Sequence, residues 1–242
     1  MGRCIFCKSV EGPFQTREHI LPESLGGGEW AVLPPGLFCD RCQNHFGSSV
    51  EQQALDDYPF NLVRVFLGIP TKKRKLPWMK SWEGKICASP VAGRIHLEPE
   101  PAFVQAIEDG TKTQLRILAH PLKPNMVCRT LLKMAIETIA FEDPTAAFDE
   151  KLDLARTFAL TGNKSGEWWY LQIENHSLAS DLIRGMPVHP FEPTALELCD
   201  IGDGAEVFHL RLFFIDMIVP MENRVVPALD DLPEPEYRLF RI

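Results

Sequence analysis

Two CxxC pairs near the N-terminus constrain the fold of this 242-residue chain more than any other feature. The first pair is Cys4 and Cys7, the second is Cys39 and Cys42, and 31 residues lie between them. Each CxxC turn presents two sulfur atoms to one side, so two such turns can supply the four thiolates of a tetrahedral zinc site. The sequence therefore predicts a structural Zn²⁺ ion that holds the N-terminal segment together.

The segment around this predicted zinc site is expected to form a small module. Residues 1–58 contain too little apolar mass to fold without the metal. Glycine and proline clusters between the two CxxC pairs leave room for a short hairpin. Beyond it, a helix is predicted from Gln43 to about Asp57, because three apolar residues recur at a spacing of four: Phe46, Val50 and Ala54. A second short helix is predicted from Pro59 to Gly68.

The remainder of the chain is predicted to be a mixed α+β domain covering residues 84–242, joined to the zinc module (1–69) by an exposed basic linker (70–83). Its apolar pattern changes between a period of two and a period near 3.6. Strands are predicted at 84–88, 94–98, 113–119, 167–174, 205–214 and 236–241, and the apolar run from Leu210 to Met221 also has the pattern of buried strands. Helices are predicted at 124–141 and 146–160. The predicted fold class is therefore α+β.

The formal net charge of −8 is unevenly distributed. Residues 1–85 contain 11 Lys and Arg against 9 Asp and Glu, whereas residues 86–242 contain 14 against 24. The first part includes a run of four basic residues, Lys72, Lys73, Arg74 and Lys75. Such a run can neutralise phosphates and release counterions when it binds nucleic acid, although a solvated linker would have the same composition. The position of the run beside a metal module favours contact with phosphate.

Composition also bears on the compartment. Four of the seven cysteines have metal-binding spacing, which is typical of a reducing environment rather than of a disulfide framework. No apolar run approaches the roughly 20 residues that span a bilayer, and the first residues lack a basic-then-apolar leader. The sequence therefore predicts a cytoplasmic protein with no membrane partner.

The residues REHILPESLGG, from Arg17 to Gly27, and CDRCQNHFG, from Cys39 to Gly47, resemble the HNH, or ββα-metal, endonucleases. More narrowly they are similar to a zinc-ribbon subgroup written CxxC…EHIxPxxLGG…CxxCNxxFG. The resemblance covers residues 4–58 and implies an N-terminal zinc-stabilised ββα-metal module that cuts DNA. It implies phage defence, restriction or mobile elements as the setting.

The resemblance also implies a catalytic site. Imidazole can accept a proton from water near neutral pH, so His19 is predicted to be the general base. Glu18 is predicted to help hold one divalent cation, Mg²⁺ or Mn²⁺, on the scissile phosphate. The family places its last ligand, an Asn or His, directly after the second CxxC. Here Gln43 occupies that position and Asn44 follows, so either could complete the site.

Contacts with nucleic acid and other partners are also predicted. Arg17 is a candidate phosphate contact, and His45 is expected to face the DNA backbone or solvent. A single ββα-metal site cuts one strand, so a double-strand break would require a homodimer or two successive events. The acidic second part is a candidate for binding a protein that controls the nuclease. The alternative function is a zinc-ribbon module that binds nucleic acid or protein and has lost catalysis through Gln43.

Overall fold

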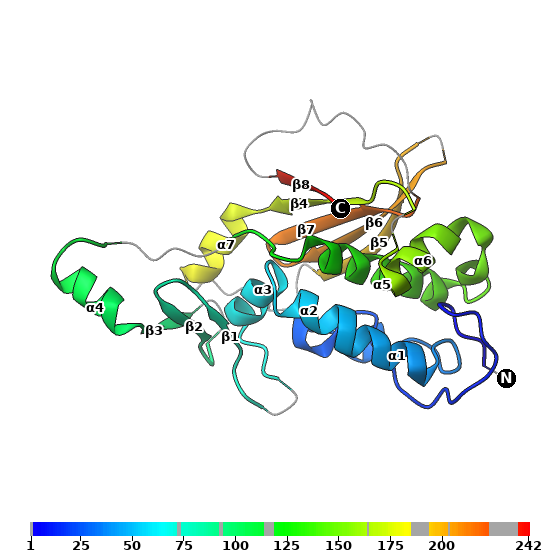
Figure 1. Ribbon diagram of the computed structural model, residues 1–242, viewed down its shortest axis with the longest axis horizontal. Helices are drawn as coiled ribbons and strands as arrows, with labels where there is room; N and C mark the ends of the chain where they lie inside the picture. Colours follow the sequence, from blue (N-terminus) through cyan, green and yellow to red (C-terminus); the bar gives the residue numbers. More distant parts are fainter. Residues whose placement is uncertain are drawn as a thin grey trace.

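The computed structural model describes residues 2–71, 74–91, 94–113, 119–163, 165–184, 194–202, 204–222 and 237–242. Its helices and two antiparallel sheets form an α+β fold (Figure 1), which confirms the predicted class. Within these ranges no helix has the length and apolarity that crossing a bilayer requires.

The N-terminal module consists of an extended segment with two 3₁₀ turns, Glu23–Leu25 and Glu29–Ala31, followed by helices. The helical stretch begins with α1 (Asp40–Phe46), widens into a π-helical turn (Gly47–Glu51) and ends as α2 (Gln52–Leu55). It corresponds to the predicted helix from Gln43 to Asp57, and its three apolar residues are fully buried as expected. Helix α3 (Phe60–Leu67) ends at Gly68, whose φ of 64° suits glycine.

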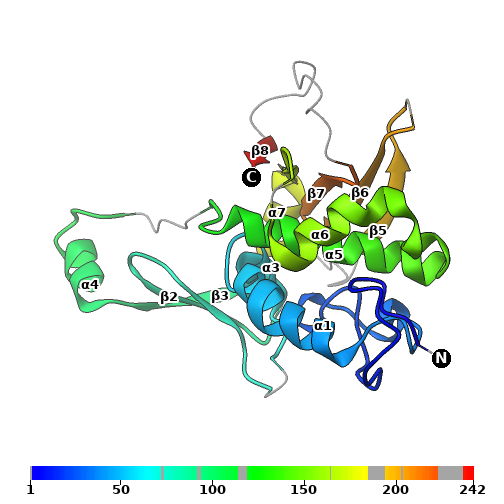
Figure 2. The same cartoon turned by 45° about the vertical axis from the view of Figure 1, so that its right-hand side comes forward.

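The segment after α3 forms a three-stranded antiparallel sheet in the order β1-β2-β3. The strands are β1 (Trp78–Lys80), β2 (Gly84–Ala88) and β3 (Ile95–Pro99), and α4 (Pro101–Glu108) follows them. In Figure 2 this sheet and α4 project from the rest of the molecule. The predicted linker 70–83 therefore contains a strand. Three residues are too short a stretch for a period of two to be recognised, so β1 was missed, as was α4. Most of the predicted strand 113–119 lies outside the described residues.

A five-stranded antiparallel sheet in the order β5-β6-β7-β4-β8 forms the other layer. Its strands are β4 (Trp169–Glu174), β5 (Thr194–Asp200), β6 (Glu206–Leu212), β7 (Ile215–Pro220) and β8 (Tyr237–Arg241). Strands β4, β6 and β8 correspond to the strands predicted at 167–174, 205–214 and 236–241. The apolar run 210–221 forms the end of β6 and all of β7. Strand β5 and the short helix α7 (His176–Ile183) were not predicted.

Helix α5 (Pro124–Glu142) lies at the centre of the molecule. It packs against β5, β6 and β7 on one side and against the π-helical turn and α2 on the other (Figure 1). Every residue from Val127 to Ala140 is buried, as expected for a helix covered all round. Helix α6 (Asp153–Thr161) packs beside it. The buried side chains form one cluster that extends from Cys4 to Phe240, and the division into 1–69 and 84–242 stays a prediction.

Candidate active site

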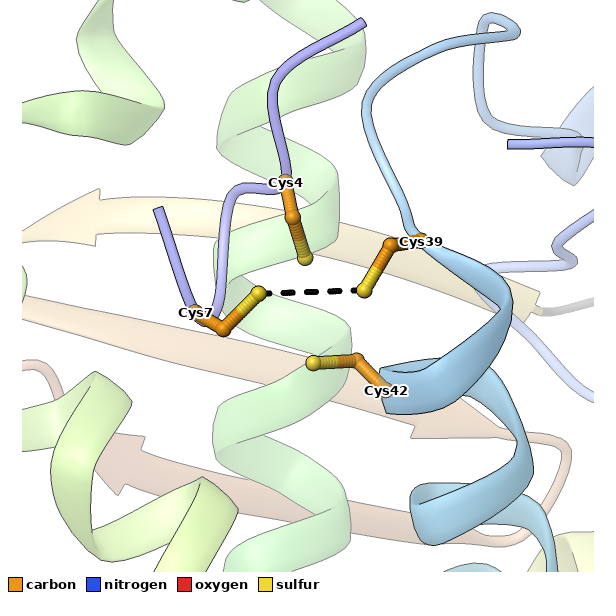
Figure 3. Close-up of side chains that lie close together, drawn as sticks. All are labelled: Cys4, Cys7, Cys39 and Cys42. Atoms are coloured by element: carbon orange, nitrogen blue, oxygen red, sulfur yellow. Dashed lines mark hydrogen bonds between the residues drawn. The ribbon is translucent and has the colours of Figure 1, made fainter. Parts of the chain in front are cut away.

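The four N-terminal cysteines converge on one point (Figure 3). Their sulfur atoms all lie within 4.8 Å of one another, and the Sγ atoms of Cys7 and Cys39 are 3.7 Å apart. A Zn–S distance of about 2.3 Å places the sulfurs of a tetrahedral site about 3.8 Å apart, so the cluster has the size of a zinc site. This four-cysteine cluster suggests a structural zinc, as predicted.

Local backbone structure positions these sulfurs. The first CxxC pair lies in a turn in which the Lys8 N–H donates to the Cys4 carbonyl at 2.9 Å. The second pair straddles the start of α1, where the Gln43 N–H donates to the Cys39 carbonyl at 3.0 Å. A hydrogen bond from the Cys42 thiol lowers the pKa of Cys4 to about 4, and the same interaction raises the pKa of Cys42. A thiolate ligand is thus favoured at the cluster at neutral pH.

A pocket of about 700 Å³ lies between the extended segment and the helices of the module. Its lining includes three residues predicted to act in catalysis, Glu18, His19 and Gln43. Glu51 lines it as well. Two arginines, Arg17 and Arg64, also line it. His19 and Gln43 are 24 residues apart in the sequence. The structure therefore brings the Glu-His pair and the residue after the second CxxC together at one cavity.

The extended segment directs Glu18 and His19 into different surroundings. His19 forms a β-bridge with Val32, and the flanking main chain donates from Ile20 to Ala31 and from Leu33 to Glu18. Successive side chains of an extended chain point to opposite sides. The Glu18 side chain is accordingly buried, whereas the His19 ring is half-buried at the pocket, with Nε2 3.7 Å from Oε1 of Glu23.

The carboxylate of Glu18 belongs to a buried ion cluster centred on Lys133 of α5. The Lys133 Nζ lies 2.7 Å from Glu18 Oε1, 2.9 Å from Glu51 Oε1 and 2.9 Å from Glu137 Oε2. Lys133 and Glu137 have no exposed surface. Burial would lower the pKa of Lys133, but the three carboxylates outweigh it and hold that pKa well above its ordinary value.

Glu137 is the innermost carboxyl group of this cluster. Burial raises the pKa of Glu137 well above its ordinary value, although the charge of Lys133 opposes that rise. Its Oε1 atom is buried and has no hydrogen-bond partner among the described residues. Its other oxygen, Oε2, lies 2.9 Å from the Lys133 Nζ, so the ammonium is the polar partner of this buried group.

The other predicted site residues differ in where they lie. Asn44 is exposed, and like His45 it is not among the residues that line the pocket. His45 was expected to face DNA or solvent, but it points to α6, where its Nε2 lies 2.7 Å from the Leu160 carbonyl oxygen. Leu160 lies in the last turn of α6, so no later N–H of the helix is available to donate a hydrogen bond to this carbonyl oxygen. Arg17 is exposed and forms a salt bridge with Glu29.

The predicted basic run is only partly covered by the structure. Lys72 and Lys73 lie outside the described residues, whereas Arg74 and Lys75 are exposed. Lys75 lines a second pocket of about 490 Å³, together with Trp78 and Lys80. Arg64 lines both pockets, so the second one adjoins the first.

Sequence reasoning missed the contribution of Lys133, Glu137 and Glu51. Lys133 is 115 residues from Glu18, and no motif connects them. One signal was present: a lysine and a glutamate four residues apart within an otherwise apolar helical stretch, where each is costly to bury unless it is paired. Glu51 lines the same pocket as Gln43.

Two further groups in the described residues bring Cys, His and Glu side chains within 4.8 Å of one another. They are Cys87 with His96 and Glu98, and Glu197 with Cys199 and His209. The groups lie on the two sheets and share no residue with the pocket, and exposed groups of this kind commonly hold no ion.

Oxygen ligands for a hard cation are available in the pocket itself. Glu18 offers a carboxylate and Gln43 an amide carbonyl, and both line the same cavity. The pocket therefore fits a divalent cation by ligand chemistry. Among the described residues the pocket contains no group of three His, Cys or acidic side chains at metal-ligand spacing, so water and substrate oxygens would supply the remaining ligands.

Residues 4–59 match the family of HNH endonucleases. This confirms the resemblance over about a quarter of the chain: the N-terminal part, with its four-cysteine cluster, is an HNH endonuclease domain. The family is of the nuclease type and implies a nucleic-acid substrate. No curated protein and no solved structure matches the chain significantly.

Proposed function

We propose that this protein is a metal-dependent endonuclease that hydrolyses DNA phosphodiester bonds in the 700 Å³ pocket. One observation carries the proposal: Glu18, His19 and Gln43 line a single cavity within the segment that matches the HNH endonucleases. A base, a hard-oxygen ligand set and a cavity open to a polymer are the parts that phosphodiester hydrolysis requires.

In this proposal His19 removes a proton from the attacking water. Its ring is partly exposed at the pocket, so water can reach it, and the bridge between His19 and Val32 fixes its backbone. Glu23 lies beside Nε2 and can stabilise the imidazolium that forms when the proton is taken up. The proton can then leave to solvent, because the side chain of Glu23 is about half exposed.

Glu18 and Gln43 would hold the divalent cation, Mg²⁺ or Mn²⁺. When bound, such an ion polarises the scissile phosphate and stabilises charge on the leaving oxygen. The thiolates of the cysteine cluster select the softer Zn²⁺, so the two metals occupy separate sites with separate tasks.

Basic side chains give the substrate a path toward the pocket. Arg17 and Arg64 line the catalytic cavity, and Lys75 and Lys80 line the adjoining one. Cationic side chains at both cavities suit a phosphate backbone, and Trp78, 57% exposed, offers a face for base stacking. DNA is the substrate that this arrangement and the family support together.

A second candidate is a module that binds nucleic acid without cutting it. One observation favours it: Gln43 stands where the family has Asn or His. Both functions share the fold and the basic surface. They differ in whether the pocket turns over substrate, so a cleavage assay separates them.

The test incubates supercoiled plasmid with zinc-loaded protein and either Mn²⁺ or Mg²⁺. The control omits the second ion rather than adding a chelator, because a chelator would also remove the structural zinc. We expect nicked circles only when the divalent ion is present. No nicking with either ion, from protein that retains its zinc and its circular dichroism spectrum, would favour the binding module.

A further inference from the structure

The Lys133 ammonium is shared by carboxylates from two distant parts of the chain. Glu18 comes from the extended segment and Glu51 from the π-helical turn, both within the HNH match, whereas Lys133 and Glu137 come from α5. An ammonium has three N–H donors, and the structure provides three carboxylate oxygens within 2.9 Å of the nitrogen. Lys133 donates hydrogen bonds to Glu18 and Glu137, and Glu51 is held beside it by an ion pair.

This cluster has one half at the pocket and one half behind it. Glu18 and Glu51 line the cavity, whereas Lys133 and Glu137 are not among its lining residues and have no exposed surface. Lys133 therefore has no access to substrate, and any effect on chemistry must pass through the two carboxylates that it holds.

The backbone at Glu51 supports the same interpretation. The helical stretch widens into a π-helical turn over Gly47–Glu51, and Glu51 is the last residue of that turn. Such turns interrupt the regular spacing of side chains and are frequent at functional sites. Here the turn accompanies a glutamate that reaches both the pocket and Lys133.

We propose that Lys133 is a positioning residue of the nuclease pocket, which holds the carboxylates of Glu18 and Glu51 in place for the divalent cation and its water. The proposal rests on the proposed function and extends it to residues outside the HNH match. Helix α5 completes the site by fixing the pocket carboxylates from behind, as hydrogen-bonded partners of metal ligands do elsewhere. The part of the chain beyond residue 83 thereby acquires a role in the nuclease.

The test measures Mn²⁺ binding to zinc-loaded, full-length protein by the loss of the free-ion electron paramagnetic resonance signal. Lys133→Met removes the ammonium and keeps the length of the side chain. We expect the dissociation constant for Mn²⁺ to rise about 10- to 100-fold, the usual effect of losing a partner of a metal ligand. Lys133→Gln keeps an amide N–H group that can donate to Glu18, so its Mn²⁺ affinity should lie between those of Lys133→Met and the parent. If Lys133→Met does not fold, Lys133→Gln is compared with the parent instead.

Arg129 provides a matched control on the same helix. It is a buried cation too, but its guanidinium donates to the carbonyls of Ala159 and Leu160 at 3.0 Å and does not line the pocket. Arg129→Met should lower the melting temperature and leave Mn²⁺ affinity near that of the parent. Zinc content and the melting temperature of each variant report on folding.

The outcomes separate this inference from the proposed function. Parent-like Mn²⁺ affinity in Lys133→Met, an equal loss in Arg129→Met, or no Mn²⁺ binding by the parent would each overturn the inference. Plasmid cleavage measured on the same samples tests the function. A parent that binds Mn²⁺ through a Lys133-dependent site but never cuts DNA would refute the nuclease and leave the positioning role intact.

Discussion

Glu18 and His19 are neighbours in the sequence, yet their side chains serve different needs. The extended backbone at this point directs Glu18 inward to Lys133 and leaves the His19 ring at the cavity beside Glu23. One dipeptide thus supplies an anchored carboxylate and an accessible base. Gln43 faces the same cavity from α1, so three side chains from the extended segment and α1 define the proposed reaction centre.

The amide at position 43 distinguishes the two candidate functions. Gln43→Asn shortens the side chain by one methylene and installs the residue that the family uses there. If the native site is active, the cleavage rate should change only modestly, within about tenfold, because the same amide oxygen remains available. The rate is measured on plasmid at saturating Mn²⁺. A parent without activity and an active Gln43→Asn variant would identify the native protein as an impaired nuclease.

At the scale of elements, the zinc cluster and the helix that follows it depend on each other. Cys42 lies in α1 and Cys39 directly precedes it, so a zinc ion held by the four cysteines would tie the start of that helix to the turn that bears Cys4 and Cys7. The pocket lies immediately beyond, with Gln43 as the next residue. Loss of zinc should therefore release both the helix start and one wall of the pocket.

Replacing Cys39 with Ser tests this dependence. Structural zinc contributes about 10–16 kcal/mol of binding free energy in small zinc-finger peptides, and in such units this is folding free energy. We expect Cys39→Ser to lose its zinc and to expose the N-terminal module to proteolysis. Cys87→Ser, in β2 and outside the cluster, serves as the control and should retain zinc. An unchanged melting curve with bound zinc in Cys39→Ser would contradict the account.

The elements that could be predicted from the sequence are those with a strong local pattern. The cysteine spacing, the stripe of Phe46, Val50 and Ala54, and the long apolar helix α5 all have a period or a chemistry that is visible within a short window. Strand β1 is too short for such a pattern. The ion cluster was missed for a different reason: the pairing of Lys133 with Glu18 depends on tertiary packing, which no local window contains.

At the scale of the whole molecule, α5 lies between the five-stranded sheet and the HNH domain (Figure 1). One core extends from the cysteine cluster to the last strand, so movement of the sheet layer relative to the pocket would disturb packing on both sides of α5. Residues 86–242 contain the excess of acidic side chains, whereas residues 1–85, which include the pocket, have a small excess of basic ones. This asymmetry should orient the molecule on a polyanion with the pocket toward it.

The basic run at positions 72–75 is expected to supply part of that attraction. Changing Lys72, Lys73, Arg74 and Lys75 to Ala should weaken binding to every DNA sequence equally and reduce the dependence of log Kd on log salt by up to about four units. Binding is measured at several salt concentrations by fluorescence anisotropy. Lys151→Ala, which removes a cation paired with Glu206 in the second part, is the control. Identical salt slopes in the parent and the fourfold variant would show that the run is only a linker.

The central claim is that His19 is the base of a nuclease, and the single-turnover cleavage rate of His19→Ala tests it most directly. The substitution leaves the zinc cluster and the Lys133 ion cluster unchanged, so zinc content and melting temperature should stay near those of the parent. We predict a rate about 10²- to 10⁴-fold below the parent, the usual contribution of a positioned general base. His176→Ala, at an exposed position at the start of α7, should cut at the parental rate. A His19→Ala protein that cuts DNA as fast as the parent would contradict the account.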